Sequence, residues 1–211
     1  MTTLSNNVST RTDEKKLLLA SKSPRRKELL AQLGYQFNVT NSDVDESTQL
    51  GESPADYVLR LAIAKAEYAF NQLSPAQQQD TLVLGSDTSV VVQGQILGKP
   101  TDEAHCTDML GLLSDTTHEV LTSIAVVSCS GVSSEVVTTK VLFKALTATE
   151  IKQYWLTGEP QDKAGSYGIQ GIGGQFIKSI TGSYSAVVGL PLFETATLLL
   201  ECGLATRLQK L

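Results

Sequence analysis

Short apolar runs alternate with segments whose apolar residues recur at helical spacing, beginning at residue 17. The run 17–20 is compatible with a buried strand. Ser23-Pro24 then provides an N-cap followed by proline at the first helical position, and Gly34 is a stop signal. We therefore predict a strand over residues 17–20 and a helix between Pro24 and Gly34. The apolar face of this helix is formed by Leu29, Leu30 and Leu33.

The same start signal recurs at Ser53-Pro54, and apolar residues follow it at helical spacing as far as Phe70. Residues 71–80 are polar and are interpreted as a connector. The segment 81–97 is rich in Val, Leu and Ile, and the Gln93-Gly94 pair inside it is typical of a hairpin turn. This part of the chain thus predicts a long helix followed by a β-hairpin.

Both kinds of element continue in the second half. We predict a helix over 101–113, strands over 120–128 and 135–143 around Gly131, a helix from the Thr147–Glu150 capping box to near Gly158, and a last helix over 191–202. Hairpins and helical crossovers in one chain predict the α/β class, with a mixed, twisted sheet and flanking helices. Residues 1–14 show no periodicity and are expected to form a disordered tail, whereas residues 15–211 are expected to form one domain.

Composition narrows the possible classes of protein. Apolar residues make up 41% of the chain and charged residues 18%, which excludes wholesale disorder. The net charge of -5 argues against a dedicated nucleic-acid binder, because such proteins usually carry a basic surplus. Three distant cysteines and two histidines make a disulfide framework or a zinc site improbable. The N-terminal residues are polar and no apolar run approaches the ~20 residues of a membrane span, so we expect a soluble, cytoplasmic protein.

The first predicted helix breaks a rule of helix termini. Exposed N–H groups and a partial positive charge make the first helical turn favour acidic residues. Here Arg25, Arg26 and Lys27 occupy that turn, and residues 15–27 hold six of the seventeen basic residues and no acid. A bound phosphate would relieve this crowding, and a solvated basic turn is the alternative interpretation.

Asp87 is unusual because it lies inside a strand-like apolar stretch. An uncompensated carboxylate costs several kcal/mol to bury. Gly85 permits a β-bulge or a close backbone approach that would expose the carboxylate at the end of a strand. Asp87 therefore marks either a turn or a cleft in which it holds a metal ion or a proton, and the apolar run Val90-Val91-Val92 directly after it favours the cleft.

Two other segments carry candidate ligands. Asp43, Asp45 and Glu46 cluster after the first helix, and together with Asp87 they could bind Mg²⁺ or Mn²⁺ through oxygen, although acidic loops are usually just solvated. Gly98-Lys99-Pro100 does not match a P-loop, because three residues instead of four separate Gly94 from Gly98, and Pro100 replaces the Ser or Thr. Lys99 is thus either a point charge for a phosphate or an ordinary surface lysine.

The segment 165–174 contains five glycines, so its backbone must fold tightly or approach another group closely. A flexible loop is the simplest interpretation, but Tyr167, Ile169 and Ile172 are too apolar for a solvated linker. Gln170 carries a donor and an acceptor that could read the edge of a base. The chain therefore contains basic residues that could bind phosphate, carboxylates that could bind a metal ion and a polar group that could bind a base. Together these features indicate a nucleotide enzyme.

Seven segments that occur in a fixed order extend this interpretation. They are LLASKSPRRKELL at 18–30, VDE at 44–46, LAIAKA at 61–66, GSDT at 85–88, GKP at 98–100, DKAG at 162–165 and VGLP at 188–191. In these segments the chain resembles the Maf family of nucleoside triphosphate pyrophosphatases, from about residue 17 to residue 203. The resemblance implies a Maf/inosine triphosphatase-like fold around a deep central cleft, a homodimer, and hydrolysis of a nucleoside triphosphate between the α- and β-phosphates to a monophosphate and pyrophosphate.

The resemblance also implies roles for individual residues. Asp87 matches the proton acceptor for the attacking water and, with Glu46, a position for a divalent cation, Mg²⁺ or Mn²⁺. The matched phosphate-handling positions are Ser23, Arg26, Lys65 and Lys99. Subfamilies differ at the positions of Arg25, Thr88 and Gln170, where this chain resembles the dTTP/UTP group rather than the 7-methyl-GTP group. Gln170 could accept from N3–H and donate to a carbonyl of thymine or uracil.

Two alternatives from other functional classes remain at this point. The first is a nucleotide-binding regulator of cell division that does not turn its ligand over, since members of the family have been linked to inhibition of septum formation. The presence of Asp87 beside matched Glu46, Lys65 and Lys99 favours catalysis instead, because binding alone needs no water-activating carboxylate. The second, polyanion binding through residues 15–27, is disfavoured by the net charge. The expected partner is thus a nucleoside triphosphate, not a nucleic acid or a membrane.

Overall fold

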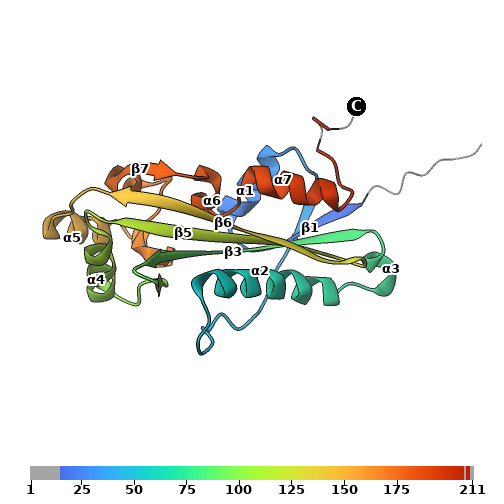
Figure 1. The fold of residues 1–211 in the computed structure, drawn as a ribbon, viewed down its shortest axis with the longest axis horizontal. Coiled ribbons are helices and arrows are strands. Elements are labelled where there is room, and N and C mark those ends of the chain that lie inside the picture. The colour runs from blue at the N-terminus through green and yellow to red at the C-terminus, as the bar shows by residue number, and fades with distance from the viewer. Residues whose placement is uncertain (1–14, 207, 210–211) are drawn as a thin grey trace, which may run out of the picture.

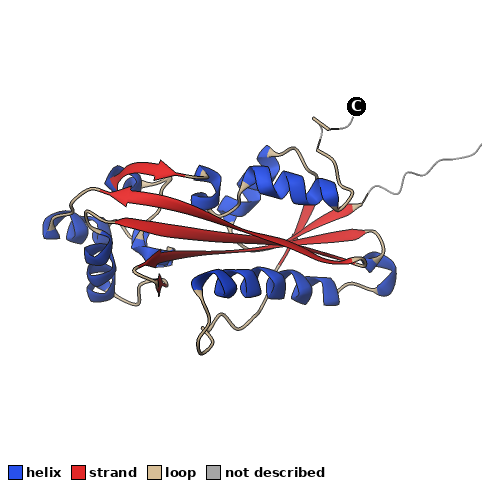
Figure 2. Ribbon diagram, in the orientation of Figure 1, coloured by secondary structure: helices blue, strands red, loops and turns tan. Residues whose placement is uncertain are grey.

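A computed structural model describes residues 15–206 and 208–209, and its centre is a seven-stranded mixed sheet with helices on both faces (Figures 1 and 2). The strand order is β2-β1-β3-β5-β6-β7, and β4 pairs with β3. β1 is parallel to β2 and β3, whereas the other pairs are antiparallel. The strands are β1 Lys16–Ala20, β2 Phe37–Thr40, β3 Thr81–Val92, β4 Gln95–Leu97, β5 Thr117–Ser128, β6 Gly131–Phe143 and β7 Ile177–Thr181. The tail expected at residues 1–14 lies outside the described residues.

The helices are distributed over both faces and one end of the sheet. Helix α2 runs along one face of the long central strands, α1 and α7 cover the other face, and α4 and α5 lie at one end (Figure 1). Their bounds are α1 Pro24–Gln32, α2 Pro54–Asn71, α3 Pro75–Gln78, α4 Glu103–Leu113, α5 Ala148–Leu156, α6 Tyr184–Val188 and α7 Leu192–Glu201, with 3₁₀ turns η1 Glu159–Asp162, η2 Ala164–Ser166 and η3 Ile172–Phe176. No described helix is long and apolar enough to cross a membrane.

The α/β class, the mixed sheet and most predicted elements are confirmed. Ser23 and Ser53 cap the two predicted helices that begin with proline, and the Thr147–Glu150 capping box has both of its hydrogen bonds. The polar connector 71–80, however, contains the short helix α3, and the sequence patterns did not reveal β2, β7 or α6. These elements have only four or five residues, and those of α3, β2 and β7 are half-buried or exposed, so they lack a clear apolar period.

The apolar core is divided along the length of β3. One cluster packs α1 and α7 against Leu82 and Leu84, near the start of the strand. Another packs α4 and α5 against Val90 and Val92, near its end. The residues between these clusters are Ser86, Asp87, Thr88 and Ser89. A run of polar side chains therefore lies where the two parts of the core separate.

The sheet is also open at this point. β1 pairs with β3 only as far as Leu84, and β4 pairs with β3 only from Val90 onward. Residues 85–89 consequently pair with β5 on one side and with no described strand on the other. The loops that follow β1 and β4, after Ala20 and after Leu97, both contribute residues to the lining of a cleft at this gap.

Gly85 allows α2 to lie directly against β3. The bulge that the sequence permitted is not formed, because the pairing of β3 with β5 runs without a register shift from Val83 to Val91. The close approach is confirmed: a Cβ atom on Gly85 would lie 2.2 Å from the carbonyl oxygen of Ala62. This contact brings Lys65, less than one helical turn further along α2, to the same strand as Asp87.

Candidate functional site

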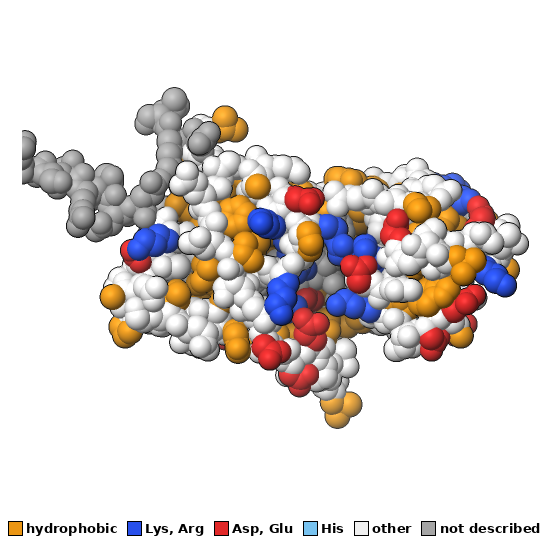
Figure 3. All heavy atoms as spheres, turned by 180° about the vertical axis from the view of Figure 1, so that it is seen from behind, with side chains coloured by type: hydrophobic (Ala, Val, Ile, Leu, Met, Phe, Trp, Pro, Cys, Tyr) orange, Lys and Arg blue, Asp and Glu red, His pale blue; other side chains and the backbone are white. Residues whose placement is uncertain are grey.

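A cleft of about 730 Å³ lies at the gap in the sheet. In the space-filling view, basic and acidic side chains gather around a hollow near the middle of the molecule (Figure 3). Eight of the nine residues to which the family resemblance gave roles line the cleft, although they come from segments far apart in the chain: Ser23, Arg25, Arg26, Glu46, Lys65, Asp87, Thr88 and Lys99. The predicted deep central cleft is therefore present.

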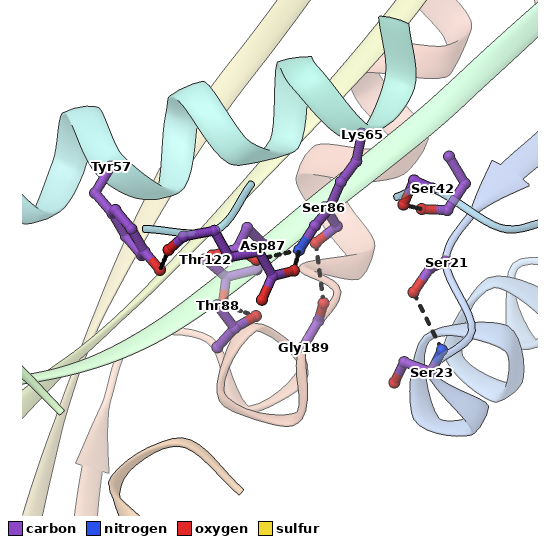
Figure 4. A network of polar contacts seen from close by, with 12 residues as sticks. Ser21, Ser23, Ser42, Tyr57, Lys65, Ser86, Asp87, Thr88, Thr122 and Gly189 are labelled. Carbon is purple, nitrogen blue, oxygen red and sulfur yellow. Dashed lines mark hydrogen bonds and ion pairs between the residues drawn. The ribbon is translucent and has the colours of Figure 1, made fainter. Parts of the chain in front are cut away.

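Lys65 joins the two candidate metal-binding carboxylates. Its Nζ lies 2.7 Å from Oδ1 of Asp87 and 2.6 Å from Oε1 of Glu46. Lys65 and Asp87 are each only 8% exposed, whereas the Glu46 side chain is 53% exposed at the mouth of the cleft. In the close view, Lys65 extends from α2 toward Asp87 on β3 (Figure 4). Asp87 thus lies in the middle of a strand and faces the cleft, so the alternative that it marks a turn is wrong.

The surroundings shift the pKa values of the two carboxyl groups in opposite directions. Burial raises the pKa of Asp87, and the positive charges of Lys65 and Arg26 only partly offset this effect. Burial also acts to raise the pKa of Glu46, but there the hydrogen bond and charge of Lys65 outweigh it, so the net pKa is lowered. An Asp with a raised pKa in a cleft has the property that a proton acceptor for catalysis requires.

Arg26 is fixed by contacts on the other face of β3. Its Nε donates to the carbonyl of Gly189 at 2.9 Å, and its Nη2 donates to Oγ1 of Thr88 at 3.1 Å. The carbonyl of Gly189 also accepts from Oγ of Ser86 at 3.1 Å (Figure 4). Burial lowers the pKa of Arg26, and the charge of Asp87 opposes that change. Arg26 therefore adds a positive charge to the cleft in a geometry set by α1, β3 and the loop before α7.

The remaining predicted phosphate ligands, Ser23 and Lys99, and the predicted specificity residue Arg25 differ in their exposure and contacts. Lys99 is exposed at the rim of the cleft. Ser23 is the N-cap of α1, and its hydroxyl accepts weakly from the backbone N–H of Arg26 at 3.5 Å. Arg25 is half-buried where the cleft meets a second pocket. Lys99 and Arg25 are thus available to an anion that enters from solvent.

The donor set fits a hard cation that keeps part of its coordination for substrate and water. Asp87 and Glu46 each use one oxygen for Lys65, and no group of three or more metal-binding side chains exists among the described residues. Asp43 also lines the cleft, but Asp45 accepts from the backbone N–H of Ser47 at 2.9 Å and is not part of the lining. A few carboxylates with open positions are typical of Mg²⁺ sites at phosphates.

A second pocket of about 330 Å³ adjoins the cleft and shares Arg25, Ala164 and Val188 with it. Its wall is formed by residues 167–171, including the exposed Gln170. Glu159 and Lys163 also line this pocket, and Tyr57 lines the cleft, although the sequence assigned a role to none of them. Lys163 lies in the DKAG motif, which could have indicated it. Tyr57 only follows the apolar pattern of α2 and Glu159 has no local pattern, so tertiary contacts reveal these two.

Comparison with known sequences agrees with this arrangement. The Maf-like protein family model matches residues 16–202, which include every residue placed in the cleft. The chain belongs to the Maf-like family.

Three curated relatives of this Maf-like protein are named dTTP/UTP pyrophosphatase. The protein of Colwellia psychrerythraea is 61% identical and matches 93% of this chain and 92% of its own length. The protein of Vibrio vulnificus is 56% identical, with 88% and 98% covered, and that of Hahella chejuensis is 50% identical, with 90% and 94% covered. Among solved structures, the Staphylococcus aureus Ham1 protein aligns with a TM-score of 0.43 at 16% identity, over 61% of this chain and 72% of that one.

Proposed function

We propose that this Maf-like protein hydrolyses dTTP and UTP between the α- and β-phosphates and releases a nucleoside monophosphate and pyrophosphate. The observation that carries the proposal is the buried pair of Asp87 and Lys65 in a cation-lined cleft that continues into a second pocket. The cleft suits a triphosphate and the adjoining pocket suits a base. The names of the relatives that are 50–61% identical over most of the chain support this substrate class.

In this proposal, Asp87 accepts the proton of the attacking water. Its raised pKa makes it a stronger base than an exposed Asp, and its ionised form is held by Lys65. Lys65 and Arg26 stabilise the charge that develops on the phosphoryl oxygens, while Lys99 meets the phosphates from the rim. Asp87 and Glu46 would hold a Mg²⁺ or Mn²⁺ ion, which supplies further stabilisation of phosphate charge when it is bound.

Base selection is assigned to the second pocket and its border. Arg25 lies where the pocket meets the cleft, Thr88 lies in the cleft under Arg26, and Gln170 lies in the pocket wall. The amide of Gln170 can satisfy both N3–H and a neighbouring carbonyl of a pyrimidine. We therefore expect kcat/KM for dTTP and UTP to exceed that for 7-methyl-GTP by at least about tenfold, which corresponds to about 1.4 kcal/mol.

The direct test is pyrophosphate release from a panel of nucleoside triphosphates with Mg²⁺ or Mn²⁺, using the wild type and Asp87→Asn. The substitution keeps the shape of the side chain and removes the base and a charged oxygen ligand, so kcat should fall by about 10²-fold or more. A melting curve serves as the structural control. A variant that melts lower but turns over within about threefold of wild type would show that Asp87 is structural.

This test also separates catalysis from the regulatory alternative. A wild-type protein that binds dTTP but releases no pyrophosphate from any nucleotide would support a binding protein instead. The homodimer is a proposal that rests on the family resemblance, and the cytoplasmic location is a proposal that rests on the sequence composition. Light scattering coupled to size-exclusion chromatography would test the first, and fractionation of cells that express the chain would test the second.

A further inference from the structure

Two side chains hold the glycine-rich strip 168–173, of which residues 168–171 line the second pocket. Glu159 accepts from the backbone N–H of Ile172 at 2.7 Å through Oε2 and from that of Gly173 at 3.0 Å through Oε1. Tyr154 donates its hydroxyl proton to Oε1 of Glu159 at 2.8 Å and accepts from the backbone N–H of Gly168 at 3.2 Å. Both ends of the strip are therefore held by one connected pair.

The glycines in the strip are explained by the same two side chains. A Cβ atom on Gly171 would lie 2.3 Å from Oε2 of Glu159, and a Cβ atom on Gly173 would lie 2.5 Å from Oη of Tyr154. Both distances are far shorter than a van der Waals contact. The backbone of the strip thus lies directly on Tyr154 and Glu159, which is the close approach that its glycine content predicted.

Burial and charge make this pair a rigid support. Tyr154 is 2% exposed, and its ring packs edge-on against Phe176 at 5.0 Å between centroids. Burial acts to raise the pKa of Glu159, but the N–H of Gly173, the hydroxyl of Tyr154 and the N–H of Ile172 outweigh it and lower the pKa. Glu159 is therefore an ionised acceptor whose hydrogen bonds to the backbone are of the strong, charge-assisted kind.

We propose that Tyr154 and Glu159 are positioning residues for base recognition, which hold the strip 168–173 so that Gln170 meets the edge of a pyrimidine. This inference rests on the proposed function and deepens it. Gly168, Gln170 and Gly171 line the pocket together with Glu159, whereas Tyr154 is not part of the lining and acts only through the strip. Loosening the strip should weaken binding of the base without changing the groups that act on the phosphates.

The test compares Tyr154→Phe with Tyr35→Phe. The first removes the hydroxyl that links Gly168 to Glu159, while the second removes a buried hydroxyl that has no hydrogen-bond partner among the described residues and lies in the cluster that packs α1 and α7 against β1. Loss of the hydrogen bonds should raise KM for dTTP about fivefold and leave kcat within about twofold. The discrimination between dTTP and 7-methyl-GTP should fall by a similar factor, and Tyr35→Phe should change none of these values.

Two probes separate base from phosphate recognition. Affinity for dTMP, measured by calorimetry, should fall in Tyr154→Phe, whereas competitive inhibition by inorganic tripolyphosphate should not change. Gly173→Ala should behave like Tyr154→Phe, since its Cβ displaces the same hydroxyl. Glu159→Gln removes the charge and one acceptor, and it provides the second variant if Tyr154→Phe does not fold.

The outcomes distinguish this inference from the proposed function. If the wild type releases no pyrophosphate, the proposed function fails, and dTMP affinity still decides the inference. Unchanged KM and dTMP affinity in a folded Tyr154→Phe would overturn the inference, as would an equal loss of tripolyphosphate inhibition or no dTMP binding by the wild type. A loss confined to base-dependent readouts in Tyr154→Phe and Gly173→Ala would support it.

Discussion

Lys65 compensates the charge of two carboxylates in the cleft. Its ammonium group contacts Asp87 and Glu46 at once, and without it two like charges would face one another. Because Lys65 and Asp87 are both buried, the charge of each depends on the other for compensation. The positive charge of Lys65 partly offsets the burial that raises the pKa of Asp87.

Replacing Lys65 with Met should therefore change both the rate and its pH dependence. Burial raises the pKa of Asp87 and Lys65 lowers it, so the substitution should raise that pKa further. In the proposed mechanism the ionised carboxylate of Asp87 is the active form, so the acid limb of kcat/KM for dTTP should move to higher pH, and the plateau should fall by about 10²-fold. Lys140→Met, at an exposed lysine on β6, is the control and should leave the profile unchanged. An acid limb that stays in place or moves to lower pH would contradict this account.

At the scale of elements, the contact between α2 and β3 places Lys65. Gly85 touches the backbone of Ala62 and Ala66, and a backbone cannot move aside as a flexible side chain can. The helix is packed by Val58 and Ala66 against the same strand and its neighbours. Because Gly85 has no side chain, α2 packs close against β3, and this close packing brings Lys65 on α2 to Asp87 on β3.

Gly85→Ala should push α2 away from β3. Overpacking of this kind typically costs about 1–3 kcal/mol in the free energy of unfolding, and the shift of Lys65 should lower kcat/KM for dTTP as well. Gly111→Ala is the matched control, because a Cβ there meets nothing within 4 Å and Ala is favoured over Gly in a helix by about 1 kcal/mol. Denaturant unfolding and initial rates measure both effects. Equal stability of the two variants would show that α2 adjusts to the methyl group.

At the scale of the whole molecule, long strands join two packed ends, and the cleft and second pocket lie between them. β5 contributes Val120 to one end of the core and Ile124 and Val126 to the other. His118, near the start of β5, is 1% exposed, and its Nε2 lies 2.8 Å from the hydroxyl of Tyr167 in the pocket wall. Burial lowers the pKa of His118 to about 4. The stability of the molecule is thus linked to the protonation of a residue behind the pocket.

This linkage predicts a loss of stability on acidification. Between pH 6.5 and about 4 the unfolded chain protonates His118 and the folded chain does not, so the free energy of unfolding falls as the pH falls through that window, by on the order of 3 kcal/mol. His118→Gln should flatten this part of the curve, whereas His105→Gln should not. Denaturant unfolding at several pH values measures the slopes. Parallel slopes for wild type and His118→Gln would contradict the prediction.

The sequence by itself determined the local structure and the class of chemistry. Proline after Ser23 and Ser53, the Gln93-Gly94 turn and the Thr147–Glu150 box predict their elements because they act through the backbone of a few adjacent residues. The run of polar residues around Asp87 inside an apolar strand marked the cleft, because burial of such groups requires compensation. The ordered motifs indicated the family and its nucleotide chemistry.

Only the tertiary structure decided how these parts meet. The ion pairs of Lys65 with Asp87 and Glu46 and the hydrogen bond from Arg26 to Gly189 join residues that are 19 to 163 positions apart. The gap in the sheet between β1 and β4 also depends on how distant strands pair with β3. The support of the glycine-rich strip by Glu159 likewise has no local pattern. Such contacts depend on which strands pair and which helix faces pack, and these are properties of the whole chain rather than of adjacent residues.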